Sequence, residues 1–371
     1  MNPAPAPPPA DRTPVARWLL ALGAAGVPLS LLWDYSWEST IGIDLVWSPP
    51  HIANYLAVAL AGGVALALLF AATPRPATGV RLSRVQAQAG AWLALWGALA
   101  FATAFIFDRW WQAGYGLAAG IWHPPQVLKA VAFFAIGIGA WLAARGGSAR
   151  CETLAGGAVI ALISTVTLAT GFANRQHGAH FYQLACGTYP VVLAAFAVAG
   201  RARWPATAAA LTGLLLTGAL VWLLPLVPGT PQVAPIYHHR DHLLPPPFPP
   251  LLIVPALVFD VLLRLFPGRT PRARGWGQAV EAGRAFFAVL LAVQWPFARF
   301  LLSPGADGWF FAGGGKNWPF FLRIASSAET NFWQMAGDEF TLRSMLLAAG
   351  AAVLATRLGL WLGAWLERLQ R

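Results

Sequence analysis

Long apolar runs separated by short charged connections constrain this chain more than any other feature. Windows of about 20 apolar residues, the length that crosses a bilayer as a helix, recur along the whole sequence. With 57% hydrophobic and 11% charged residues, a water-soluble domain of this size would leave too much apolar surface exposed. We therefore predict an all-α polytopic bundle of about ten membrane spans, at 15–33, 51–73, 87–107, 123–144, 153–173, 181–200, 205–227, 248–266, 280–302 and 341–366.

The charges indicate how the chain lies in the membrane. Lys and Arg gather in every second connection, which marks the cytoplasmic side, so the N-terminus and the C-terminus are both predicted to be cytoplasmic. These connections account for the formal net charge of +11, and we expect no nucleic-acid partner. The predicted localisation is multi-pass in a bacterial inner (cytoplasmic) membrane, with the lipid bilayer as surrounding partner. All seven histidines then fall on the outer side.

Two segments of the first half resemble each other. Asp34-Tyr-Ser-Trp followed by Trp47-Ser-Pro-Pro-His51 is matched by Asp108-Arg-Trp-Trp followed by Trp122-His-Pro-Pro-Gln126, with one residue inserted. Each segment follows an outward helix and precedes an inward one, so a helical hairpin is predicted to be duplicated. The chain then divides into a disordered tail, duplicated transmembrane hairpins, a transmembrane bundle, an outer interfacial segment and a last helix with its tail, at 1–14, 15–150, 151–302, 303–340 and 341–371.

Acidic and imidazole side chains near these helix ends form the candidate site. Asp34 and Asp108 lie at helix ends where the helix dipole disfavours a carboxylate, so each needs a partner or a metal ion. Imidazoles with a carboxylate suit copper, zinc or iron better than calcium or magnesium. We expect copper on the outer side, with zinc or iron as alternatives. The predicted metal-binding residues are Asp34, Glu38, His51, Asp108, His123, His177 and His180.

A purely structural interpretation stands beside this one. Prolines at 49–50 and 124–125 favour helix starts, and the histidines could form a hydrogen-bonded polar rim over the helix ends. His177 and His180 share a face only if their segment is helical. The loop cluster at 238–242, with His238, His239 and His242, is Pro-flanked and is expected to be surface.

Polar residues also lie within predicted spans. Ionisable groups are costly to place in a membrane, so each is a candidate for a functional role. Lys129 can extend its ammonium group outward, and Asp260 can pair with Arg264 one turn further on. Arg357 lies within the last span. We expect Lys129 to matter most for function.

The segment Pro247-Phe-Pro-Pro-Leu-Leu-Ile-Val-Pro-Ala-Leu-Val-Phe-Asp260 resembles the membrane-spanning A subunit of particulate methane and ammonia monooxygenases. Lys316-Asn317-Trp318-Pro319 and Trp33-Asp34-Tyr35 are similar to motifs of that family and keep their order. The repeat also resembles uncharacterised bacterial polytopic membrane proteins with a Trp-Ser-Pro-Pro-His motif. The first resemblance implies a copper-oxygenase-like scaffold or complex member. It assigns no catalytic residue here, because that family's principal copper ligands are attributed to partner subunits.

Three functions remain open from the sequence. The first is an integral-membrane subunit of a metal-dependent, copper-containing oxidoreductase that acts with other membrane subunits on a small apolar substrate. The second is a transporter or metal-handling permease, indicated by the repeat and by Lys129 within a span. The third is a non-catalytic scaffold subunit of a respiratory or photosynthetic complex, with 303–340 as its docking surface.

Overall fold

The computed structural model contains a bundle of long helices. It describes residues 13–42, 45–70, 80–82, 85–116, 122–167, 176–230, 232, 241–265, 271–306, 308–311 and 340–368. In these ranges the α-helices are α1 Thr13–Thr40, α2 Pro49–Phe70, α3 Ala89–Tyr115, α4 Pro124–Ala144, α5 Ala149–Thr167, α6 Ala179–Ala199, α7 Pro205–Leu223, α8 Ile253–Leu265, α9 Pro271–Leu301 and α11 Leu342–Arg368. Nine helical segments in this described part are long and apolar enough to span a membrane. The prediction of an all-α polytopic bundle is therefore confirmed.

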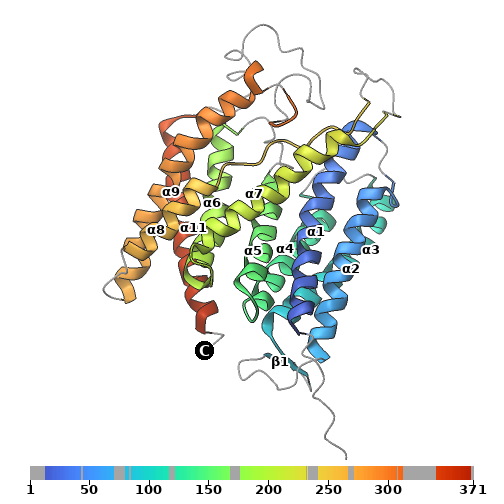
Figure 1. Ribbon diagram of the computed structural model, residues 1–371, viewed down its shortest axis with the longest axis horizontal. Helices are drawn as coiled ribbons and strands as arrows, with labels where there is room; N and C mark the ends of the chain where they lie inside the picture. The colour runs from blue at the N-terminus through green and yellow to red at the C-terminus, as the bar shows by residue number, and fades with distance from the viewer. Residues whose placement is uncertain are drawn as a thin grey trace, which may run out of the picture.

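Four short elements lie between the helices in the described residues, namely β1, β2, η2 and η3. Between α2 and α3, β1 (Val80–Leu82) and β2 (Val85–Ala87) pair antiparallel. This hairpin lies at the same end of the bundle as the C-terminus, which we call the inner end (Figure 1). The opposite end, which carries the α1–α2 and α3–α4 connections, is called the outer end. The 3-10 turn η2 (Leu224–Leu226) follows α7, and η3 (Pro304–Ala306) follows α9.

The first four helices form two antiparallel hairpins, α1 with α2 and α3 with α4 (Figure 1). Each hairpin packs through a glycine at an equivalent position. A Cβ on Gly23 would lie 3.0 Å from the Ala61 nitrogen of α2, and one on Gly97 would lie 2.8 Å from the Ile136 nitrogen of α4. The glycines are 74 residues apart and the facing residues 75, which matches the single insertion in the sequence repeat. The two hairpins therefore share one packing register.

The second half of the bundle packs around α6. The helices α11 and α6 lie side by side, α11 also packs on α9, and α5 packs on α7. Before α8, the described residues 243–252 form neither helix nor strand. The Leu244 nitrogen donates to Thr40 Oγ1 at 2.8 Å, and Ser36 Oγ donates to the Leu244 carbonyl. These bonds fix the proline-rich segment 243–250 against the outer end of α1.

Helix α8 is shorter than the sequence indicated, beginning at Ile253 where the predicted span began at 248. The prolines at 245–250 lack the N–H groups that a helix needs, so this stretch stays extended. Several sequence predictions lie wholly or mostly outside the described residues, namely the tail at 1–14, the segment 303–340 with Lys316-Asn317-Trp318-Pro319, and His238 and His239.

Candidate functional site

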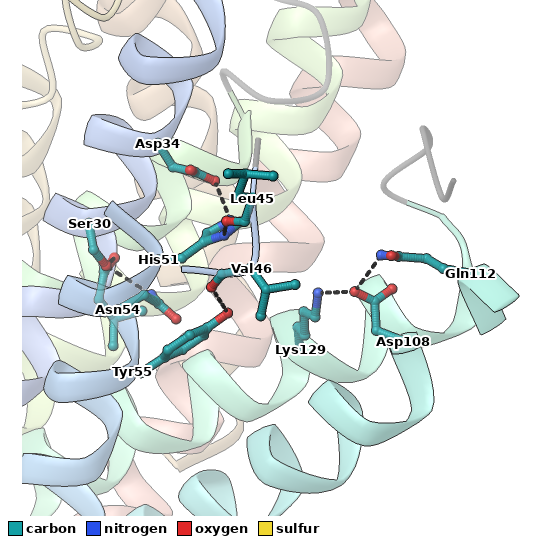
Figure 2. A network of polar contacts seen from close by, with 11 residues as sticks. Ser30, Asp34, Leu45, Val46, His51, Asn54, Tyr55, Asp108, Gln112 and Lys129 are labelled. Carbon is teal, nitrogen blue, oxygen red and sulfur yellow. Dashed lines mark hydrogen bonds and ion pairs between the residues drawn. The ribbon is translucent and has the colours of Figure 1, made fainter. Parts of the chain in front are cut away.

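Asp34 of α1 meets His51 of α2 across the first hairpin. Asp34 lies six residues before the end of α1, and His51 is the third residue of α2, so both lie about one helical turn inside the outer end. His51 Nε2 is 3.4 Å from Asp34 Oδ2, and the side chains are 25% and 20% exposed. Figure 2 shows the imidazole directed at the carboxylate. We call Asp34 and His51 the first pair.

Two neighbours hold the His51 ring in place. Its Nδ1 lies 2.9 Å from the Leu45 carbonyl, and the ring stacks on Tyr55. A carbonyl can only accept a hydrogen bond, so Nδ1 carries the donated proton. In neutral imidazole the lone pair is then on Nε2, the atom that faces Asp34. The Leu45 bond thus leaves Nε2 as the ring nitrogen directed at the Asp34 carboxylate.

Asp108 of α3 meets Lys129 of α4 across the second hairpin. Lys129 Nζ lies 2.7 Å from Asp108 Oδ2, and Gln112 Nε2 donates to the same oxygen at 3.1 Å (Figure 2). The Asp108 side chain is only 9% exposed and that of Lys129 is 21% exposed. The Lys129 ammonium group is therefore paired with Asp108 across the second hairpin. We call Asp108 and Lys129 the second pair.

Both aspartates use one oxygen for their partner and keep the other buried. Within the described part of the chain, neither Asp34 Oδ1 nor Asp108 Oδ1 has a hydrogen-bond partner. A buried carboxylate oxygen without a donor is costly. Each aspartate therefore retains an oxygen that can accept from a cation or a donor group.

The other predicted ligands do not join the first pair. Glu38 is exposed one turn beyond Asp34, and His123 is the N-cap residue of α4, with its ring against Trp111. His177 is buried beside Trp295, whereas His180 is exposed at the start of α6. Because α6 begins only at Ala179, the two do not share a helical face.

The metal-binding side chains of the described residues do not gather into a resident metal centre. Across the described ranges, no group of three or more His, Cys, Asp or Glu side chains lies close enough to hold a metal ion. A structural or catalytic copper, zinc or iron site has three or more protein ligands as a rule. The described residues therefore do not fit such a centre, although the first pair supplies one nitrogen and one oxygen ligand.

Asp260 plays a different role from the one the sequence suggested. It is buried in α8 and accepts hydrogen bonds from the Thr207 nitrogen at 2.8 Å and from Thr207 Oγ1 at 2.7 Å. It thereby caps the N-terminus of α7, where the helix dipole favours a negative charge. Pairing with Arg264 is wrong, because Arg264 instead lies over the Trp204 ring, 4.1 Å from its centroid. Arg357 similarly lies over the Trp276 ring.

A buried amide network was missed by the sequence reasoning. Gln294 of α9 donates to Gln176 Oε1 and accepts from the Leu251 nitrogen at 2.9 Å. Gln176 in turn donates to the Phe248 carbonyl at 2.9 Å. Together they hold the extended segment before α8 against α9. A glutamine inside an otherwise apolar span was the available signal, because such a group must find partners.

The inner end carries a charged cluster that was also missed. Arg145 lies 3.9 Å from buried Glu152, and Arg201 donates to the carbonyls of Arg145 and Gly147 at 2.8 and 2.6 Å. Arg17 donates to the Gly146 carbonyl at 2.6 Å. Burial lowers the pKa of the Arg145 guanidinium, while the charge of Glu152 opposes this. The cluster links α1, α5 and the α6–α7 connection to the α4–α5 turn.

Comparisons of the chain with protein families, curated proteins and solved structures gave no match. The fold and the site therefore define the class by themselves. The chain is a polytopic α-helical protein with the length and apolarity of a multi-pass membrane protein. Its two repeated hairpins each carry one carboxylate–base pair at the outer end.

Proposed function

We propose that the chain is a membrane permease that takes up a divalent transition-metal cation from the outer side. The observation that carries this proposal is the geometry of the first pair. An ion about 2.0–2.1 Å from both His51 Nε2 and Asp34 Oδ2, which are 3.4 Å apart, would have an angle of about 110° between them, close to tetrahedral. Metal-binding histidines commonly donate their other N–H to a backbone carbonyl, as His51 does to Leu45.

An incomplete ligand set suits a transported ion better than a resident one. A cation that must leave again needs a site weak enough to release it. Two protein ligands leave the remaining positions to water or to residues further along the path. The first pair also lies at a partly exposed position at the outer end, where an ion could enter. A resident copper centre would need further ligands that the described residues do not provide.

The architecture supports the same proposal. Transport proteins often contain repeated helical units with polar groups inside the spans. Here α1–α2 and α3–α4 share one packing register and place an aspartate at the same level. The inner cluster around Arg145 and Glu152 lies at the opposite end of the bundle.

Zn²⁺ uptake into proteoliposomes containing the purified full chain tests the proposal, with a zinc-sensitive dye inside. We expect faster uptake than in protein-free liposomes. His51→Gln and Asp34→Asn should each lower apparent Zn²⁺ affinity about tenfold or more, since each removes a ligand. Gln126→Ala is the matched control, because Gln126 occupies the His51 position in the second hairpin, and it should transport like the unaltered chain. Melting temperatures verify that all variants fold.

Two results would overturn the proposal. One is uptake no faster than in protein-free liposomes, or uptake unchanged in both His51→Gln and Asp34→Asn. The other is stoichiometric copper that stays with the purified protein through chelator dialysis, which would indicate a resident metal centre.

A further inference from the structure

The second pair contains a cation already, and it belongs to the chain itself. The ammonium group of Lys129 lies 2.7 Å from Asp108 Oδ2. The Asp108 side chain is more than nine-tenths buried, and Oδ1 has no hydrogen-bond partner among the described residues. A carboxylate this deeply buried needs a positive charge or hydrogen-bond donors beside it.

The packing register shows which residues correspond between the hairpins. The offsets set by Gly23 and Gly97 and the residues facing them match Asp34 with Asp108 and Asn54 with Lys129. In the first hairpin, Asn54 donates to Ser30 Oγ at 2.8 Å, one turn before Asp34. In the second hairpin, the residue matched to Ser30 is Ala104, which offers no such acceptor. The longer Lys129 side chain reaches Asp108 instead.

We propose that the second pair is a cation-binding site of the duplicated hairpin that Lys129 occupies as a tethered substitute for a free cation. The inference rests on the proposed function in treating the matched Asp34 as a cation ligand, but it concerns a different carboxylate. Lys129 thereby limits the outer end to one exchangeable cation, at the first pair. It is a specificity-determining residue, because it blocks one of two matched carboxylates.

The site behind Lys129 should prefer a different class of cation from the first pair. Gln126 stands where the first hairpin has His51, and Gln112 stands where it has Glu38. Asp108 therefore offers carboxylate oxygen ligands, with no matched imidazole beside it. Oxygen ligands suit Mn²⁺ and Mg²⁺ better than copper or zinc. Removing Lys129 should expose a site for such a hard cation.

Mn²⁺ binding measured by electron paramagnetic resonance tests this inference. All variants of the full chain carry Asp34→Asn, so that the first pair contributes no carboxylate and the result does not depend on Zn²⁺ uptake. We expect Asp34→Asn with Lys129→Gln to bind one more Mn²⁺ per chain than Asp34→Asn alone. Adding Asp108→Asn should remove that ion. A folded Lys129→Gln variant that binds no additional Mn²⁺ would overturn the inference, whatever the outcome of the transport assay.

A second measurement remains informative if the loss of Lys129 destabilises the chain. Lys129→Ala leaves space and an unpaired carboxylate, which a small alkylammonium ion such as ethylammonium can fill. Ethylammonium chloride should raise the melting temperature of Lys129→Ala above its value in equal sodium chloride, because a ligand that binds the folded state stabilises it. Lys129→Ala with Asp108→Asn should show no such rise. Equal shifts in the single and double variants would contradict the proposed site.

Discussion

Replacing Asp260 by alanine should weaken the junction between α7 and α8. Asp260 Oδ2 accepts from the Thr207 nitrogen at 2.8 Å and from Thr207 Oγ1 at 2.7 Å, and Oδ1 accepts from the Ala206 nitrogen at 3.3 Å. The Ala206 and Thr207 nitrogens belong to the first turn of α7, whose N–H groups have no acceptor within the helix itself. The carboxylate is buried, so water cannot easily replace it in the variant.

The size of the effect follows from these contacts. Loss of a helix N-cap costs up to about 2 kcal/mol, and a buried donor left without a partner costs about 1–3 kcal/mol. Since the two terms overlap, we expect Asp260→Ala to lower the free energy of unfolding by about 2–4 kcal/mol. Asp260→Asn keeps one acceptor oxygen but loses the favourable charge at the helix N-terminus, so it should cost about 1–2 kcal/mol.

The two cysteines provide the assay. Cys151 and Cys186 are both free and buried, so a thiol-reactive fluorophore reports unfolding during an SDS titration. Asp241→Ala is the control, because the Asp241 side chain is 97% exposed and its removal should change stability by less than about 0.5 kcal/mol. If Asp260→Ala unfolds within about 0.5 kcal/mol of Asp241→Ala, the capping interpretation is refuted.

Three further substitutions, the first with a matched control, test the packing and the polar contacts. A Cβ on Gly139 would lie 2.5 Å from the Ala94 nitrogen, so Gly139→Ala should cost about 1–3 kcal/mol. Gly63→Ala, where the described residues leave open space, should leave the free energy of unfolding unchanged or raise it in the SDS titration. An equal loss of stability in Gly139→Ala and Gly63→Ala would contradict this packing. Gln294→Leu leaves the Leu251 N–H without its acceptor and should cost about 2 kcal/mol or more in the SDS titration, where an unchanged midpoint would argue against the amide network. Tyr55→Phe deletes the hydrogen bond to the Val46 carbonyl and should cost about 0.5–1.5 kcal/mol, while a Zn²⁺ uptake rate as low as that of His51→Gln would show that Tyr55 also acts in the site.

The spans were predictable because burial in a bilayer acts on each segment separately. A helix that crosses hydrocarbon satisfies its backbone internally, so length and apolarity decide its existence without knowledge of neighbours. The start of α2 at Pro49 and of α4 at Pro124 followed from proline's preference for the first turn. The start of α8 did not, because several consecutive prolines can begin a helix or hold an extended segment.

The partner of each polar residue was less predictable, because it depends on which helices become neighbours. Arg264 is one turn from Asp260 on the same helix, which made it the natural local choice. The structure instead places the N-terminus of α7 beside Asp260. The sequence predicted that Asp34 and Asp108 need partners, but the helix-dipole reason for it is wrong, because α1 continues six residues beyond Asp34 and α3 seven beyond Asp108. Their actual partners, His51 and Lys129, required the register of each hairpin.

The two hairpins meet the same physical demand in different ways. Each places an aspartate within the outer part of a helix, where its carboxylate has limited access to water. The second hairpin meets the demand with a permanently charged side chain, so its carboxylate needs nothing from outside. The first hairpin offers an imidazole whose Nδ1 is engaged by a carbonyl and whose Nε2 faces the carboxylate at 3.4 Å. Under the proposed function, the first hairpin is the copy whose aspartate holds an exchangeable cation, as the entrance of a permease requires.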